Sequence, residues 1–152
     1  MHDEPTRINP PLFLASTVIG CWHCGADMPA VALVAPNVPE TEGTVCILSD
    51  IRQLPQSVLT FIHNRFPTFK LKYSKMARSE YYANTCPKCG VLSGDFYLHA
   101  EPGAPFFPTD AEEAAELTIE QIPISQSIEV QAGHGMGVGK LILECAKRIE
   151  AE

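Results

Sequence analysis

The sequence predicts a single α+β domain over residues 1–152, in which antiparallel strands pack against two main helices. The 152 residues are 45% apolar and 19% charged, which is enough apolar material for one globular core. Short apolar runs bounded by proline and glycine predict strands, and two segments with apolar residues every three or four positions predict helices. Two Cys-x-x-Cys-Gly turns, at 20–25 and 85–90, interrupt this pattern.

The first half of the chain opens with a polar segment over 1–11, which we expect to be loose. Branched and aromatic residues then predict three strands, over 12–19, 31–35 and 44–48. The first main helix is expected at about 55–66. Pro55 suits a first helical turn because its missing N–H has no partner there, and Pro67 ends the element.

The second half begins with two predicted strands, over 69–73 and 80–84. A stiff loop over 101–108 should dock Phe106 and Phe107 on the core, and Asp110 should cap a short helix over 111–116. Strands are expected over 117–124 and 127–131. The second main helix is expected at about 140–150, because Ile142, Cys145 and Ile149 share one helical face.

The strongest chemical signal is the pair of cysteine turns, which contain Cys21, Cys24, Cys86 and Cys89. Two cysteines three positions apart on a tight turn aim both sulfurs at one point, and the following glycine permits the backbone conformation this needs. Two such turns supply the four thiolates that structural zinc prefers. The turns resemble the zinc knuckles of the zinc-ribbon group. The resemblance covers these two turns alone and implies an embedded, ribbon-like structural Zn²⁺ site.

The spacing between the turns differs from a compact ribbon, because 61 residues separate Cys24 from Cys86. The extra loop length costs only about 1 kcal/mol of closure entropy, whereas structural zinc contributes roughly 10–16 kcal/mol in peptides. We therefore expect the metal ion to cross-link two segments of one domain. A disulfide, a thioredoxin-like redox pair at Cys21 and Cys24, and an iron–sulfur cluster remain alternatives.

The other candidate groups favour structural roles. Cys46 and Cys145 have apolar neighbours and read as small core residues, and a fourth cysteine makes His23 unnecessary as a ligand. A closed four-thiolate shell leaves no open position for catalysis, and no other residues form a recognisable active site. The glycine-rich segment 133–139 lacks the spacing of a phosphate loop and is expected to be a turn before the last helix, with anion binding as a weak alternative.

The net charge of −7 disfavours nucleic acid, but the charge is unevenly distributed. Seven basic residues and one acidic residue lie between Ile51 and Lys88, whereas 89–139 contains eight acidic residues and no lysine or arginine. Aromatic residues are interleaved with the basic ones, a pattern that can hold a single strand by charge and stacking. The basic candidates for contact with nucleic acid or another partner are Lys70, Lys72, Lys75 and Arg78.

From these observations we expect a non-enzymatic, zinc-stabilised protein that acts by protein–protein interaction or regulation. The alternative is a nucleic-acid-associated zinc-ribbon protein that uses the basic 70–78 segment, and the third hypothesis is a thiol oxidoreductase acting through Cys21 and Cys24. No apolar run is long enough for a membrane helix, and the first residues carry acids where a secretory signal has lysines. We therefore expect a cytoplasmic location and no contact with membranes.

Overall fold

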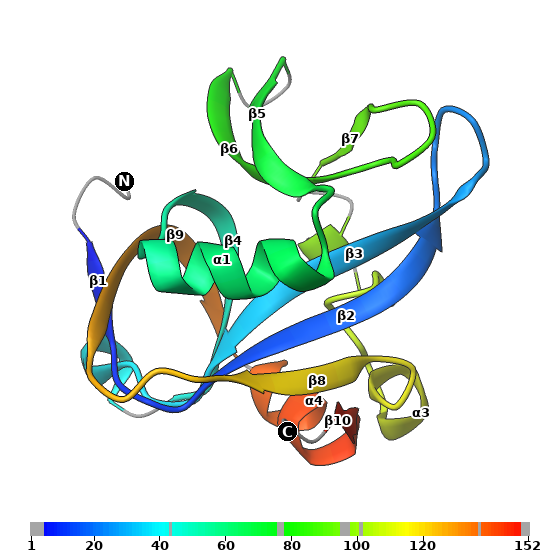
Figure 1. Cartoon of the computed structure of the whole chain (residues 1–152). Helices are drawn as coiled ribbons and strands as arrows, with labels where there is room; N and C mark the ends of the chain where they lie inside the picture. Colours follow the sequence, from blue (N-terminus) through cyan, green and yellow to red (C-terminus); the bar gives the residue numbers. More distant parts are fainter. Residues whose placement is uncertain are drawn as a thin grey trace.

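The computed structural model describes residues 5–42, 44–75, 78–94, 98–100, 102–136 and 138–149. Within these ranges ten strands join into one mixed sheet (Figure 1). The strands are β1 (Thr6–Ile8), β2 (Leu12–Gly20), β3 (Asp27–Ala35), β4 (Cys46–Gln53), β5 (Phe69–Ser74), β6 (Ser79–Thr85), β7 (Leu92–Ser93), β8 (Thr118–Ile122), β9 (Ile128–Met136) and β10 (Lys147–Ile149). The main path runs β1-β9-β4-β3-β2-β8-β10, and β6 joins it through β4 while also pairing with β5 and β7.

The predicted α+β class is wrong, because strands dominate the described residues and the helices are short. These helices are α1 (Gln56–Arg65), α3 (Ala111–Ala114) and α4 (Gly139–Cys145), together with a 3-10 turn, η1 (Pro39–Thr41). The helix expected over 140–150 stops at Cys145, and the chain continues as β10, which pairs in parallel with β8. The main-chain N–H of Lys147 donates to the carbonyl of Leu117 at 2.9 Å. This sheet pairing overrides the helical spacing that Ile149 shares with Ile142.

Most other predicted elements occur with shifted ends. Helix α1 confirms the helix expected at 55–66, although Pro55 is its N-cap and the first turn begins at Gln56. Asp110 caps α3 by accepting from the N–H of Glu113 at 2.9 Å, and Phe106 is fully buried. The segment expected to be loose contributes β1, which pairs with β9. Residues 1–4 of that segment lie outside the described ranges.

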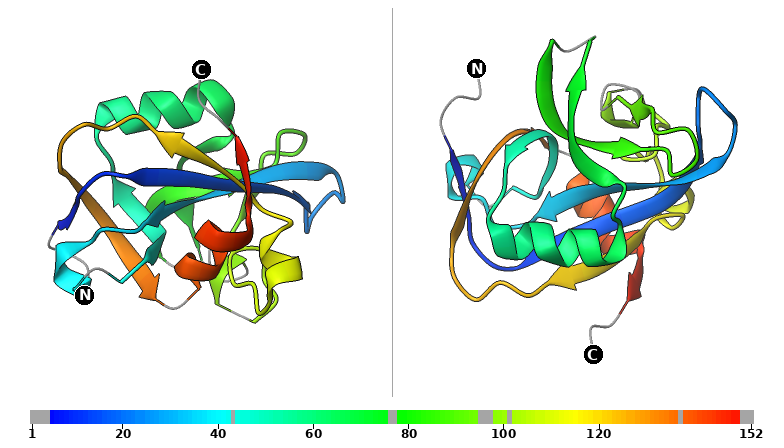
Figure 2. Two further views of the ribbon diagram at one scale, coloured as in Figure 1. Left: turned by 90° about the horizontal axis from the view of Figure 1, so that it is seen from below. Right: turned by 45° about the horizontal axis from the view of Figure 1, so that its top comes forward.

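The sheet is covered on both faces, which explains the unbroken apolar run of β3. Alternate residues of this strand serve two cores: Val31 and Leu33 face the cluster beneath α1, while Ala32 and Val34 face the cluster that contains Phe106 and α4. A strand buried on both faces has no polar alternation. Figure 2 shows α1 on one side of the sheet and α4 on the other.

The glycine-rich segment expected to be a turn is partly strand. β9 continues to Met136, and Gly135 pairs with Ile47 of β4. Gly139 then opens α4 with its Cα packed closely against Val45: a Cβ there would lie 2.7 Å from Val45 Cγ1. Gly137 lies outside the described residues. In the part of the chain that the structure describes, no helix is long and apolar enough to cross a membrane.

Two hairpins project from this body at one end (Figure 1). The β5–β6 hairpin rises above α1, and β6 leads into β7 beside the tip of the β2–β3 hairpin. Asn84 of β6 connects this end to the main sheet, since its side chain accepts from the N–H of Val31 at 2.9 Å and donates to the Val31 carbonyl at 3.1 Å. The cysteine turns lie in this region.

Candidate metal centre and adjoining groove

The two cysteine turns have the same backbone structure. The first connects β2 to β3 and the second connects β6 to β7. In each, the N–H of the glycine donates to the carbonyl of the first cysteine at 2.9 Å, as Gly25 does to Cys21 and Gly90 to Cys86. The glycines have φ values of 77° and 82°, in the left-handed region that other residues rarely adopt. The glycine after each second cysteine is thus required by the turn itself.

The turns bring four sulfur atoms together. The Sγ atoms of Cys21, Cys24, Cys86 and Cys89 all lie within 4.8 Å of one another. Cys21 and Cys89 are 3.6 Å apart, and Cys24 and Cys86 are 3.7 Å apart. Zn–S bonds of about 2.3 Å in a tetrahedron place neighbouring sulfurs about 3.8 Å apart. The cluster therefore has the dimensions of a tetrahedral metal shell.

These two sulfur pairs are too far apart for disulfide bonds, in which the sulfurs lie about 2 Å apart. All six cysteines of the chain are free thiols. Cys21 and Cys86 are buried against Met28 in a small apolar cluster at this end of the molecule, and Cys24 and Cys89 are exposed. Four thiols from two hairpins, converging on one point, can hold a metal ion.

Backbone amides favour thiolate at the first cysteine of each turn. The N–H of Cys24 lowers the pKa of Cys21, and the N–H of Cys89 lowers the pKa of Cys86 to about 6. Further amides, from His23 and Lys88, lie 3.4 Å from these sulfurs. The fourth thiol behaves differently. The N–H of Val91 lowers the pKa of Cys89, but desolvation of its sulfur and the three neighbouring sulfurs outweigh it and raise the value to about 12. A metal cation held here would supply the positive charge that four thiolates need.

The remaining cysteines and His23 lie outside this cluster. Cys46 is completely buried in the core beneath α1, and Cys145 is half-buried in α4. His23 is exposed, with its ring against Trp22 at a centroid distance of 5.5 Å.

A groove of about 1690 Å³ adjoins the metal centre, and Cys89 forms part of its wall. Its lining comes from several segments: the β2–β3 turn, β4, the β5–β6 hairpin, the residues around β7, the loop before α3, and β9. Two of the four predicted basic residues, Lys72 and Lys75, line it. The other two do not: Lys70 and Arg78 are exposed but are absent from the lining. The structure thus divides the basic segment into two pairs.

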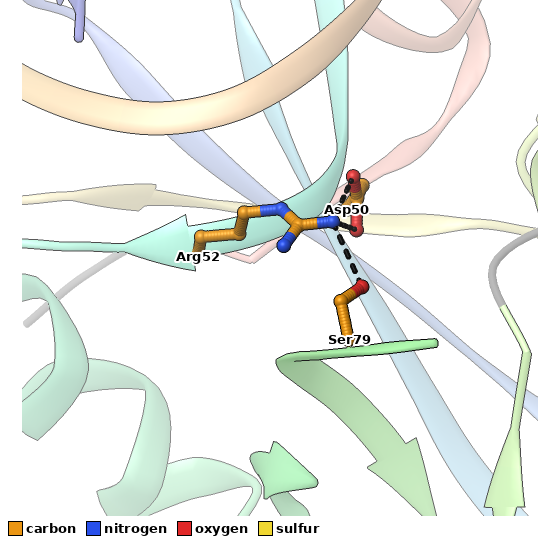
Figure 3. A network of polar contacts seen from close by, with 3 residues as sticks. All are labelled: Asp50, Arg52 and Ser79. Atoms are coloured by element: carbon orange, nitrogen blue, oxygen red, sulfur yellow. Dashed lines mark hydrogen bonds and ion pairs between the residues drawn. The ribbon is translucent and has the colours of Figure 1, made fainter. Parts of the chain in front are cut away.

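An ion pair on β4, which the sequence analysis did not single out, also lines the groove (Figure 3). Arg52 Nη2 lies 3.1 Å from Asp50 Oδ2 and donates to Ser79 Oγ at 2.9 Å. Asp50 has a φ of 50°, where the pairing of β4 with β9 shifts register. Left-handed backbone at an aspartate is uncommon. No sequence pattern marks it, because it is part of a bulge that depends on the partner strand.

His99 is another lining residue. Its ring lies on Phe106 with a centroid distance of 5.2 Å. Burial lowers the pKa of this imidazole to about 4, so the side chain is neutral at physiological pH. Among the buried side-chain nitrogens and oxygens of the described residues, its Nδ1 is the one atom without a hydrogen-bond partner.

Comparison with known proteins gives no relative: no family model, curated protein or solved structure matches the chain.

Proposed function

We propose that this is a non-enzymatic, zinc-stabilised binding protein, in which a structural Zn²⁺ holds together the two hairpins beside the groove. The observation that carries the proposal is the convergence of four cysteine sulfurs at tetrahedral spacing. The ligands would be Cys21, Cys24, Cys86 and Cys89. Four thiolates and hydrogen-bonding amides are typical of structural zinc, whose closed shell has no position for a substrate or an activated water.

The metal has a mechanical role in this proposal. Cys21 and Cys24 belong to the β2–β3 hairpin, whereas Cys86 and Cys89 belong to the β6–β7 turn. Few buried apolar residues connect these two hairpins, so metal binding supplies free energy that the local core does not. The groove begins at this junction. A binding role therefore suits the groove better than a catalytic role, since the proposed metal has no open coordination position for a substrate.

The test is metal content measured by mass spectrometry on the purified protein and on cysteine variants. Wild type should carry one zinc per chain, and Cys86→Ser should lose the metal and unfold at lower temperature, because binding free energy is also folding free energy. Cys145→Ser is the matched control: it removes a half-buried thiol outside the cluster and should keep the zinc. Stoichiometric zinc in a Cys21→Ser, Cys86→Ser double variant would contradict the ligand assignment. Iron and inorganic sulfide in the purified wild-type protein would show that the site holds an iron–sulfur cluster instead of zinc.

Thiol reactivity provides a second measurement. If all four thiolates are bound, labelling of Cys24 and Cys89 should be slow until a chelator is added, although both residues are exposed. Rapid labelling of Cys21 in the zinc-loaded protein, together with disulfide reductase activity, would support the oxidoreductase hypothesis instead.

A further inference from the structure

We propose that the groove binds a single-stranded segment of nucleic acid, with phosphates on Arg52, Lys72 and Lys75 and a base stacked on Trp22. This inference rests on the proposed function, because the zinc centre fixes the hairpin that carries Trp22. The net negative charge of the chain favours a protein partner. The arrangement of charged and aromatic side chains in the groove favours nucleic acid.

Positive charge is concentrated in the described lining of the groove. Among the described lining residues three carry positive charge, Arg52, Lys72 and Lys75, and one carries negative charge, Asp50. Asp50 is paired with Arg52, and His99 is neutral at physiological pH because burial lowers its pKa to about 4. The described lining therefore carries a net positive charge although the chain as a whole has a net charge of −7. A concentration of cations in one concave surface attracts an anionic chain at short range.

The second argument is the geometry of Arg52. Its hydrogen bonds to Asp50 and Ser79 all use Nη2. Across the described ranges, Nε and Nη1 of this side chain have no partner, and the side chain is 36% exposed. The guanidinium is thus held in place by one nitrogen while other N–H groups remain available. Such a fork binds two phosphate oxygens at once.

The third argument is an aromatic ring held at the surface. Trp22 is the single tryptophan of the chain and is 66% exposed. Its Nε1 donates to the carbonyl of Leu92 at 2.8 Å, which ties the first cysteine turn to the strand after the second. The indole therefore lies in the wall of the groove with a fixed orientation and an exposed surface. Tyr73, 57% exposed, lines the same groove. Rings of this kind stack with nucleic-acid bases.

The size of the groove agrees with a polymer segment. Its volume of about 1690 Å³ exceeds the roughly 300–1,000 Å³ of ordinary small-molecule pockets. An acidic peptide would satisfy the lysines and Arg52, but its side chains would leave the faces of Trp22 and Tyr73 without a stacking partner. Single-stranded nucleic acid satisfies both the cations and the rings.

The experiment uses the fluorescence of Trp22, which reports on the groove without any label. Zinc-loaded protein is titrated with an oligothymidylate of about eight nucleotides, within known single-strand site sizes. Stacking should quench the emission. The association constant should fall with salt, with a slope of about −2 in its logarithm against log salt, from three phosphates at about −0.7 each. The same titration with a glutamate-rich peptide should leave the emission unchanged.

Variants separate the groove from the rest of the basic segment. The double variant Lys72→Ala, Lys75→Ala should reduce the magnitude of the slope by about 1.4. Lys70→Ala is the matched control, because Lys70 lies exposed on the same strand but outside the groove, and it should leave the slope unchanged. Tyr73→Leu should weaken binding more than Tyr73→Phe, which keeps the ring.

Zinc content is measured on every sample. This distinguishes a variant that has lost its metal from one that holds zinc but does not bind the oligonucleotide in the groove. A protein that holds zinc but shows neither quenching nor binding at low salt would overturn this inference and leave the proposed function intact. Equal binding of the glutamate-rich peptide, with the same dependence on Lys72 and Lys75, would show that the partner is an acidic protein. An effect of Lys70→Ala as large as that of the double variant would also refute the groove assignment.

Discussion

Replacing Asn84 by alanine should destabilise the protein by about 3 kcal/mol. Asn84 is 2% exposed, and its amide forms two hydrogen bonds with the main chain of Val31. β4 pairs with β3 at Leu33, Val34 and Ala35, so the edge of β3 at Val31 lies beyond this pairing. The side-chain amide of Asn84 therefore forms the two hydrogen bonds that the main chain of Val31 would otherwise form with a neighbouring strand.

The magnitude follows from what the substitution leaves behind. Asn84→Ala removes the partners of one buried N–H and one buried carbonyl, and each unsatisfied group costs about 1–3 kcal/mol. With an m-value of about 2 kcal/mol/M, a loss of about 3 kcal/mol lowers the urea midpoint by about 1.5 M. The control is Gln56→Ala, which removes an exposed amide bonded to Thr60 on α1. Its effect should stay within about 0.5 kcal/mol.

Both variants are compared with wild type in the zinc-loaded form, by circular dichroism in urea. Since Asn84 lies two residues before Cys86, the variant should also release zinc to a chelator faster than Gln56→Ala does. If the midpoint of Asn84→Ala moves no more than that of the control, the two bonds to Val31 contribute nothing to stability, and the account of how β6 is attached to the sheet is wrong.

Two further substitutions test the packing around the site. Burial lowers the pKa of His99 to about 4, so between pH 6.5 and 4 the unfolded state takes up a proton that the folded state does not. The free energy of unfolding should therefore fall by up to about 3 kcal/mol as the pH drops through this range, and His99→Phe should lose this component in urea titrations at several pH values. Gly139→Ala should destabilise by about 1–3 kcal/mol, because the new Cβ would lie 2.7 Å from Val45 Cγ1. Gly135→Ala, where the nearest atom is 3.6 Å away, should not, and thermal unfolding compares the pair.

Local signals in the sequence were sufficient for the elements that depend on local physics. The cap at Asp110 and the proline at the start of α1 are set by hydrogen bonding within a few residues. The closeness of the two sulfurs within each Cys-x-x-Cys-Gly turn was also predictable, because the turn geometry fixes them by itself. These features needed no knowledge of the topology.

Non-local pairing accounts for the failures. Residues Lys147–Ile149 form β10 because they pair with the free edge of β8. Their own sequence does not indicate that such an edge lies nearby. The strand content was underestimated for the same reason: β9 continues through Gly133 and Gly135 because these residues pair with β4. The groove was missed because it draws on segments from Ile19 to Val138, and no single stretch of sequence contains it.

The metal centre and the groove occupy the end of the molecule where the hydrophobic core is smallest. Its local cluster has three fully buried members, Cys21, Met28 and Cys86, whereas the clusters on the two faces of the sheet each have many more. Ordering the hairpins at this end costs conformational entropy that so small a core cannot offset. The proposed metal would supply that free energy without covering surface, which would leave Trp22 and Tyr73 exposed for the proposed partner. A larger apolar core at the same place would have buried these rings.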